Sequence, residues 1–285
     1  MIILHDPQCA DFGSETRPEQ PARVRRATEF LRAAHPGWEW RLPRMADESV
    51  LALAHAPELL QQLQNPEGDF DEDTPYVPDI YAHARRSVGA ALEAVDLARA
   101  GQKVFSLMRP PGHHATYREA MGFCYLNQVA IAGLVARQQG VARVAIWDFD
   151  AHHGNGTEDI LKGREGFAVC SVHQFPGYPG TGTQDTIGCR NWPIAPHATR
   201  EVQMQALRQA WDHLLAFQPE LMLISAGFDA YAHDPVATLS LEMSDFGELG
   251  KWVREAALPT AAVLEGGYSP DLPQLMDAFL SAWEG

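Results

Sequence analysis

The stretch VAIWDFDAHHGNG, residues Val144–Gly156, joins a strand-like segment to an unusually polar one. Its first four residues, Val144–Trp147, are all apolar, which predicts a strand. Asp148, Asp150, His152 and His153 follow directly. Acidic and imidazole side chains placed just after a strand indicate a ligand site, because open parallel sheets bind ligands at the carboxyl ends of their strands.

Strand-like apolar runs alternate with helical patterns along the whole chain, which is typical of a parallel sheet flanked by helices. Four further strands are predicted at Val104–Leu107, Phe167–Val172, Leu221–Ser225 and Thr260–Leu264. Helices are predicted at Pro21–Ala34, Ile80–Ala100, Gly122–Gln139, Arg200–Phe217, Met243–Glu255 and Leu272–Trp283, with Gly101 and Gly140 placed as C-terminal caps. Surface loops are expected at Asn65–Pro78 and Phe175–Gly188. Because no linker interrupts the 285 residues, we expect a single α/β domain, residues 1–285.

Polar residues follow each of the five predicted strands. His113 and His114 come after the first of them, and His173, Asp229 and Tyr268 come after the last three. Because the carboxyl ends of parallel strands meet at one edge of a sheet, these residues are expected to build one site.

A metal ion is the ligand that this set of residues suits best. Residues two apart in an extended segment point the same way, so Asp150 and His152 can converge on one ion. Asp229 is the best-placed third ligand, and two carboxylates with one imidazole and an open position suit catalytic Zn²⁺. Fe²⁺, Co²⁺ or Mn²⁺ could occupy the same mixed site. The alternative for each residue taken alone is a helix cap or an ion pair.

Two further motifs carry groups for acid–base chemistry. The turn before His113 and His114 is stiffened by prolines and aims both imidazoles at the strand edge, where a neutral histidine can take a proton from water. Gly266 and Gly267 let the backbone turn sharply before Tyr268, whose phenol can donate to a developing oxyanion. Taken alone, the histidines could be a polar rim and the glycines only a turn.

Composition excludes several classes of protein. The formal net charge of −15 argues against binding a nucleic-acid backbone, but it suits attraction of cationic substrates. No signal peptide opens the sequence and no uncharged run is long enough to cross a bilayer, so we expect a cytoplasmic protein without a membrane partner. Buried, reduced thiols are expected at Cys9, Cys124, Cys170 and Cys189, which form no Cys-x-x-Cys pair.

Six ordered motifs resemble those of the histone deacetylase and acetylpolyamine amidohydrolase superfamily, in its class II and bacterial branch. They are Arg109–Ala115 (RPPGHHA), Gly122–Asn127 (GFCYLN), Trp147–Gly156 (WDFDAHHGNG), Tyr178–Gly182 (YPGTG), Ser225–Asp229 (SAGFD) with Asp234-Pro235, and Leu264–Tyr268 (LEGGY). Arg17–Arg23 (RPEQPAR) resembles the entry motif of the family, so the match covers nearly the whole chain. The resemblance implies the arginase–deacetylase fold, with a mainly parallel sheet of about eight strands between helices.

The resemblance also implies a role for each site residue. One zinc ion would be bound by Asp150, His152 and Asp229. His114 would be the general base, His113 a second, protonated histidine oriented by Asp148, and Tyr268 the residue that polarises the acyl carbonyl. Phe123 and Tyr178, beside Gly122, would form the walls of a slot for an aliphatic amine stem. A structural K⁺ would be bound by the side chains of Asp148 and Ser171 and by backbone carbonyls of Asp150, His152 and Val172.

Three residues differ from those that are usual in the family that this chain resembles. Asn155 stands where class I members carry aspartate, with an expected effect on the pKa of His114. Gln128 replaces a usual asparagine, and Arg17 stands beside the expected rim where histidine is common.

The implied reaction is hydrolysis of an N-acyl amine, either acetyl-lysine in a protein, an acetylpolyamine or another small acylated amine. Polyamine specialists carry a long insertion for which Asn65–Pro78 is short, so we expect a more open site that takes acyl-lysine or a broad set of acylated amines, with acetylpolyamine as the alternative. The acidic residues of that loop either attract a cationic substrate or only face solvent. An arginase-like ureohydrolase would need a second set of metal-binding aspartates. A non-catalytic acyl-lysine reader would not need Tyr268 as an acid.

Overall fold

The computed structural model describes all 285 residues and contains one eight-stranded sheet. The strands are β1 (Ile2–Leu4), β2 (Glu39–Arg41), β3 (Val104–Ser106), β4 (Val144–Asp148), β5 (Phe167–Gln174), β6 (Cys189–Ile194), β7 (Leu221–Ala226) and β8 (Thr260–Leu264). Their order is β2-β1-β3-β8-β7-β4-β5-β6, and every neighbouring pair is parallel. All eight carboxyl ends therefore lie along the same edge of the sheet.

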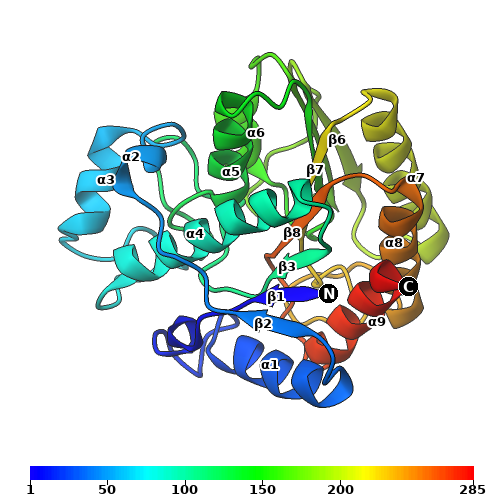
Figure 1. Cartoon of the computed structure of the whole chain (residues 1–285), viewed down its shortest axis with the longest axis horizontal. Coiled ribbons are helices and arrows are strands. Elements are labelled where there is room, and N and C mark those ends of the chain that lie inside the picture. The colour runs from blue at the N-terminus through cyan, green and yellow to red at the C-terminus, as the bar shows by residue number, and fades with distance from the viewer.

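Helices cover both faces of the sheet (Figure 1). They are the 3₁₀ helix η1 (Pro7–Ala10) and the α-helices α1 (Ala22–Ala34), α2 (Glu48–Leu51), α3 (Pro57–Gln64), α4 (Ile80–Arg99), α5 (Gln128–Gln138), α6 (Asn155–Leu161), α7 (Arg200–Ala216), α8 (Met243–Ala256) and α9 (Leu272–Glu284). Helices α4, α5 and α6 pack on one face, whereas α1, α7, α8 and α9 pack on the other. The α/β architecture expected from the sequence is confirmed.

The five predicted strands and five of the six predicted helices are present, with bounds that differ by at most two residues. Gly101 and Gly140 follow α4 and α5 with φ of +80° and +92°, as expected of C-terminal caps. The sequence did not predict the three remaining strands. β1 and β2 have only three residues each, and β6 is an edge strand interrupted by Pro193.

The predicted helix Gly122–Gln139 is wrong at its start. Gly122 and Phe123 have φ of +55° and +68°, values that no right-handed helix contains. The helix begins instead at Gln128, where the side chain of Asn127 accepts a hydrogen bond of 2.9 Å from the amide of Ala130. The segment before Asn127 is thereby released from the helix, and its residues Gly122 and Phe123 line the pocket described below.

A buried aromatic cluster joins the centre of the sheet to the helices on one face. The Trp147 ring lies 4.7 Å from that of Trp211 on α7, 5.2 Å from that of Phe149 and 6.3 Å from that of Trp252 on α8. Trp147 and Phe149 flank Asp148 in the chain, so packing of their rings fixes the backbone that carries the first acidic residues of the site.

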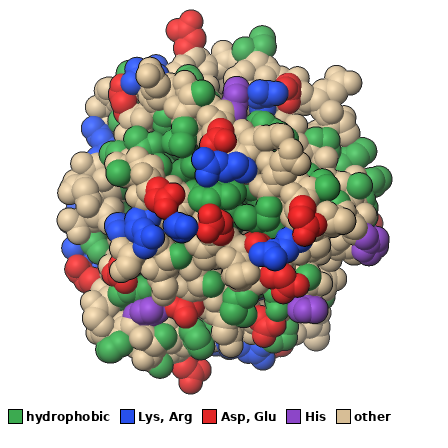
Figure 2. Space-filling view, turned by 90° about the vertical axis from the view of Figure 1, so that its right-hand side faces the viewer, with side chains coloured by type: hydrophobic (Ala, Val, Ile, Leu, Met, Phe, Trp, Pro, Cys, Tyr) green, Lys and Arg blue, Asp and Glu red, His purple; other side chains and the backbone are tan.

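The surface charge, the cysteines and the helices can be compared with what the composition predicted. Acidic and basic side chains are intermixed on the face shown in Figure 2, with no continuous basic area there. All four cysteines are buried and unpaired, as predicted. None of the helices combines the length and the apolar character that crossing a membrane requires.

Candidate active site

The carboxyl edge of the sheet brings most of the predicted site residues together. Asp148 ends β4, with Asp150 and His152 just beyond it, and Asp229 and Tyr268 follow β7 and β8. His173 is the exception, because it lies inside β5. Its imidazole bonds to Ser171 Oγ at 2.8 Å and to a backbone carbonyl at 3.0 Å, and it is not part of the pocket.

Three side chains at this edge have the spacing of a metal site. His152 Nδ1 lies 3.1 Å from Asp150 Oδ1 and 3.0 Å from Asp229 Oδ2. Ligand atoms about 2 Å from a tetrahedral zinc ion are about 3.3 Å apart, so these separations fit one ion between the three. The second carboxylate oxygens are held by backbone amides, since Gly266 N donates to Asp150 Oδ2 (2.7 Å) and Ala151 N to Asp229 Oδ1 (2.8 Å).

Two glycines leave room for the carboxylates. A Cβ atom at Gly227 would lie 2.1 Å from Asp150 Oδ2, and one at Gly266 would lie 2.2 Å from Asp229 Oδ2. Any side chain at either position would displace a carboxylate. The motifs SAGFD and LEGGY therefore need their glycines for close approach of the backbone to the acidic groups.

The charge around the three side chains favours a cation. Burial opposes charge on His152, but hydrogen bonds to Asp150 and Asp229 hold the pKa of its imidazole well above the ordinary value. Burial also raises the pKa of Asp229, and the neighbouring Asp150 carboxylate raises it further. Two buried carboxylates facing one imidazole thus demand a positive charge, which a divalent ion would supply. The donor set and the spacing fit such an ion.

A second group of potential ligands, His113, Cys124 and Glu265, lies beside the first. Its carboxylate is already engaged, because Glu265 Oε2 accepts hydrogen bonds from the amides of Gly112 (2.7 Å) and His113 (3.2 Å). Burial raises the pKa of the Cys124 thiol well above its usual range, which disfavours the thiolate that a metal needs. Glu265 instead fixes the loop that carries the two histidines.

The two adjacent histidines have opposite environments although their rings are only 4.0 Å apart. His113 Nδ1 lies 3.0 Å from Asp148 Oδ2, and burial is outweighed by the Asp150 and Asp148 carboxylates, which raise its pKa to about 10. Burial and the nearby His113 instead hold the pKa of His114 well below its ordinary value. His113 is therefore the charged member of the pair and His114 the neutral one.

Asn155 fixes the tautomer of His114. Its side-chain oxygen lies 2.7 Å from His114 Nδ1, and because a carbonyl oxygen only accepts, Nδ1 carries the proton. His114 Nε2 remains as the acceptor. An aspartate in place of Asn155 would favour the charged imidazole, so this departure from the class I pattern helps to keep His114 neutral.

His114 and His152, one of the three candidate metal ligands, line a pocket of about 300 Å³. Its lining includes His114, His152, Gly122, Phe123, Tyr178 and Tyr268. The rings of Phe123 and Tyr268 are 5.9 Å apart, and that of Tyr178 lies 4.9 Å from the ring of His114. Burial raises the pKa of Tyr268 well above its usual value, so its phenol keeps its proton at neutral pH. The residues predicted as slot walls and as oxyanion donor thus share one pocket with the predicted base.

The acidic loop Asn65–Pro78 contains no helix or strand, as predicted, but it does more than face solvent. The amide of Gly122 donates to Asp71 Oδ2 at 3.1 Å, and that of Phe123 donates to the buried Thr74 Oγ1 at 3.0 Å. These bonds hold Gly122 and Phe123 in their left-handed conformations. Asp73 of the same loop lines the pocket.

A buried chain of ions links the loop of His113 and His114 to the loop of Tyr268, and sequence reasoning missed it. The Glu19 carboxylate pairs with the guanidinium groups of Arg109, before the histidine loop, and of Arg23. Arg23 Nε donates to the carbonyl of Gly267 at 2.7 Å, and its guanidinium lies 4.8 Å from the centre of the Tyr268 ring. The motif RPEQPAR contains both Glu19 and Arg23, but sequence spacing does not reveal their distant partners.

Asp234 was noted in the sequence without a role. Its Oδ2 accepts hydrogen bonds from the amides of Tyr268 (2.7 Å) and Ser269 (3.1 Å), and Oδ1 accepts from Val236 N at 2.9 Å. The carboxylate therefore holds the turn that presents Tyr268.

Three of the five residues predicted to bind a monovalent cation, Asp148, Ser171 and Val172, lie on the neighbouring strands β4 and β5, whereas Asp150 and His152 lie in the loop just beyond β4. Asp148 and Ser171 are directly paired in the β4–β5 register, and Val172 follows on β5. Ser171 Oγ also lies 3.4 Å from the amide of Gly154. Gln128, which stands where the family usually has asparagine, is the first residue of α5. Its side-chain Nε2 donates to the carbonyl of Pro110 at 3.4 Å.

The chain resembles known proteins over nearly its whole length. The sequence profile of the histone deacetylase domain matches residues 17–283. A probable deacetylase of Methanothermobacter thermautotrophicus is 33% identical, over all of this chain and 91% of its own. Acetylpolyamine amidohydrolase 2 of Pseudomonas aeruginosa is 31% identical, over 91% of this chain and 79% of its own. The crystal structure of acetylpolyamine aminohydrolase from Burkholderia pseudomallei has a TM-score of 0.92 at 27% identity, covering 100% of this chain and 99% of that one.

Proposed function

The chain belongs to the histone deacetylase family and has its arginase–deacetylase fold, and we propose that it is a zinc-dependent deacetylase of N-acetylated amines. The net reaction adds water across an amide bond and releases acetate and a free amine. One eight-stranded sheet supports the view that residues 1–285 form a single catalytic domain. The observation that carries the proposal is a pocket lined both by a neutral His114 and by His152, whose imidazole lies against the carboxylates of Asp150 and Asp229.

Asp150, His152 and Asp229 would hold one Zn²⁺, as their spacing and charge support. When bound, the ion would supply Lewis acidity that polarises the acyl carbonyl and makes a water molecule more acidic. The hydrogen bonds from Gly266 and Ala151 to the outer carboxylate oxygens would keep the three ligands in place without any rearrangement.

His114 Nε2 would take the proton of the attacking water and later deliver it to the leaving nitrogen. The Asn155 hydrogen bond supports this role, because it leaves Nε2 free and the ring neutral. His113, held by Asp148, would keep a positive charge beside the reaction centre and so stabilise the negative charge that develops there.

Tyr268 would donate its phenolic hydrogen to the carbonyl oxygen as negative charge grows on it. Its raised pKa supports a donor that stays protonated. Phe123 and Tyr178, beside Gly122, would hold the aliphatic stem that joins the acyl group to the rest of the substrate. The hydrogen bond from the amide of Gly122 to Asp71 ties this wall to the acidic loop. Backbone carbonyls of Asp150, His152 and Val172 with the side chains of Asp148 and Ser171 would bind a structural K⁺, which the strand pairing of Asp148 with Ser171 supports.

Relatives named acetylpolyamine amidohydrolase support a small acylated amine as the substrate class, with acetyl-lysine as the alternative. The test is a turnover panel of acetyl-lysine peptides, longer acyl-lysines and acetylpolyamines, with acetate release measured for wild type and for His114→Ala. We expect turnover of at least one acetylated amine by the wild type only. Equal acetate release by both proteins would contradict the proposed role of His114.

A further inference from the structure

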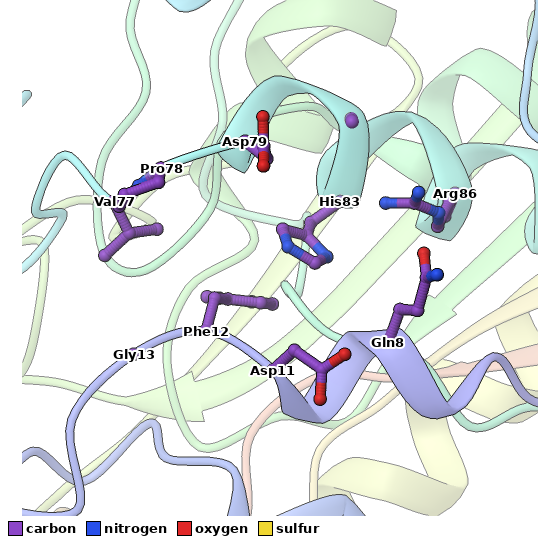
Figure 3. A pocket seen from close by; sticks show the side chains of 10 residues that line it. Gln8, Asp11, Phe12, Gly13, Val77, Pro78, Asp79, His83 and Arg86 are labelled. Atoms are coloured by element: carbon purple, nitrogen blue, oxygen red, sulfur yellow. The ribbon is translucent and has the colours of Figure 1, made fainter.

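A cavity of about 690 Å³ lies between η1 and the start of α4 and shares no lining residue with the catalytic pocket (Figure 3). Its carboxylates, those of Asp11 and Asp79, are exposed to solvent, so it is an open hollow of the surface and not an enclosed binding site. A set of enclosed polar groups that the proposed reaction does not use lies elsewhere, around His173 near the end of β5.

The hydrogen bonds of His173 fix its tautomer. The ring is completely buried, and its nitrogens contact a hydroxyl and a backbone carbonyl but no carboxylate, so a charged imidazolium would lack a counter-ion. Burial lowers the pKa of His173 to about 3, in agreement with a neutral ring. Because the carbonyl of Gly182 can only accept, His173 Nε2 carries the proton and donates to it at 3.0 Å. Nδ1 is therefore an acceptor.

This tautomer orients the hydroxyl group of Ser171. Ser171 Oγ lies 2.8 Å from His173 Nδ1, and because that nitrogen carries no proton, the hydroxyl donates its own. A serine hydroxyl has one hydrogen and two lone pairs, so the lone pairs of Ser171 Oγ are left for other partners. An oxygen held in this orientation suits a cation, because its hydrogen is directed away from the ion.

Ser171 Oγ and the carboxylate of Asp148 lie close together beside Gly154. The amide of Gly154 is 3.4 Å from Ser171 Oγ, and a Cβ atom at Gly154 would lie 2.2 Å from Asp148 Oδ2. Asp148 and Ser171 are also directly paired between β4 and β5. A buried carboxylate and a hydroxyl with free lone pairs are oxygen donors, which fit a hard cation such as K⁺.

His173 also holds the loop that carries one wall of the proposed slot. A Cβ atom at Gly182 would lie 2.4 Å from His173 Nε2, so the backbone of this loop packs directly against the imidazole. Thr181 Oγ1 lies 2.8 Å from Nδ1 of His153, whose ring is 4.6 Å from that of His173. Tyr178, which lines the catalytic pocket, belongs to the same loop. One imidazole thus contacts both a proposed cation ligand and the loop of the slot wall.

We propose that His173 is a positioning residue that orients Ser171 for a monovalent cation and links the bound cation to the loop of Tyr178. This role rests on the proposed function, which assigns K⁺ to Asp148 and Ser171. His173 Nδ1 acts on the cation side by fixing the hydroxyl of Ser171, and Nε2 acts on the slot side by donating to Gly182.

Two amide substitutions separate the two sides of this role. Asparagine can place its amide oxygen where Nδ1 lies, so His173→Asn keeps the acceptor for Ser171 and loses the donor to Gly182. Glutamine can place its amide nitrogen where Nε2 lies, so His173→Gln keeps the donor and loses the acceptor. Because both variants replace the same buried ring, a merely structural role would affect both sides alike.

Thermal unfolding in increasing KCl tests the cation side, with the full chain in the presence of zinc and with choline chloride holding the ionic strength constant. The Tm of wild type should rise with KCl, because an ion that binds only the native state stabilises it. The apparent Kd for K⁺ should increase about tenfold in His173→Gln and stay within about twofold of wild type in His173→Asn. A wild-type Tm that is independent of KCl, or an equal loss of K⁺ affinity in both variants, would overturn the proposal.

Two controls show whether His173 acts through Ser171. Ser171→Ala should weaken K⁺ binding by itself, and adding His173→Gln should weaken it no further. His55→Gln is the matched control for the loss of a buried histidine, because His55 is also completely buried and bonds to a backbone carbonyl, that of Thr116, at 2.9 Å. It should lower Tm and leave the Kd for K⁺ unchanged. Loss of K⁺ affinity in His55→Gln, or a further loss in the double variant, would contradict the proposed route.

Amide hydrogen exchange of the segment Tyr178–Gly182 tests the slot side. In wild type, KCl should slow this exchange at least roughly fivefold, the lower end of ordinary coupling between two sites. Both variants of His173 should lose the response to KCl, since each lacks one of the two bonds, and without KCl only His173→Asn should exchange faster than wild type. Exchange that ignores KCl in wild type, or that responds equally in the variants, would refute the link. Neither measurement needs turnover, so a protein that releases no acetate would refute the proposed function and still decide the role of His173.

Discussion

Replacing Tyr268 with phenylalanine removes one hydrogen-bond donor from the catalytic pocket and little else. The Tyr268 ring packs 5.9 Å from that of Phe123 and under the Arg23 guanidinium at 4.8 Å, and a phenylalanine ring keeps both contacts. The phenol has no hydrogen-bond partner within the protein, and Tyr268 lines the pocket. The free energy of unfolding should therefore change by no more than about 0.5 kcal/mol.

The effect on catalysis should be far larger than the effect on stability. A donor aimed at charge that appears only in the transition state contributes about 3–4 kcal/mol, which corresponds to a loss of roughly 10²–10³-fold in kcat. Because the same hydrogen bond is weak in the ground state, KM should change little.

Steady-state kinetics on an acetylated amine, with direct binding measured on the same compound, separates the two effects. Tyr178→Phe is the matched control, because it deletes the same hydroxyl from the opposite wall of the same pocket and should alter kcat by no more than a few-fold. A Tyr268→Phe enzyme with a raised KM and an unchanged kcat would show that the phenol binds substrate and that another group stabilises the oxyanion.

Three further predictions follow from the site. Asp229→Ala should abolish binding of the one divalent ion and turnover together, as measured by metal analysis and kinetics; two tightly bound ions per wild-type chain would contradict a single site. His114→Ala should lower kcat severely with zinc retained, and His113→Ala should be milder; the reverse order would exchange their roles. Glu19→Gln should destabilise the fold at pH 7 by about 3–5 kcal/mol in denaturant unfolding, because Arg109 would lose its buried counter-ion.

The pH dependence of the Glu19 effect has a definite sign. Burial opposes the charge of Glu19, but Arg109 and Arg23 hold its pKa below the ordinary value. Its contribution to stability is therefore present at neutral pH and is lost as the pH falls through the lowered pKa. The difference between wild type and Glu19→Gln should shrink in acid, and a difference that grows there would refute the ion chain.

Much of the fold could be predicted because its signals are local. The five central strands are apolar runs followed by polar residues, and their parallel pairing places those residues along one edge. Short edge strands such as β2 carry too few residues for a pattern, and the false start of α5 arose because its apolar spacing continues back through Phe123. Only the positive φ values and the Asn127 cap reveal where the helix begins.

The site could be predicted where function demands particular residue types in one segment, as in Asp150 and His152. Residues that act through distant partners gave no such signal. Glu19 meets Arg109 across ninety positions of the chain, and Asp234 binds the amide of Tyr268 across thirty-four.

The most direct test of the proposed function is a zinc titration of metal-free protein with acetate release from an acetylated amine as the readout. We predict that activity rises linearly and reaches its maximum at one Zn²⁺ per chain, and that Tyr268→Phe binds the same single ion without reaching a comparable rate. A wild-type protein that binds one ion and the acetylated amine, yet releases no acetate from any member of the panel, would contradict the assignment as a deacetylase and would identify an acyl-amine binding protein instead.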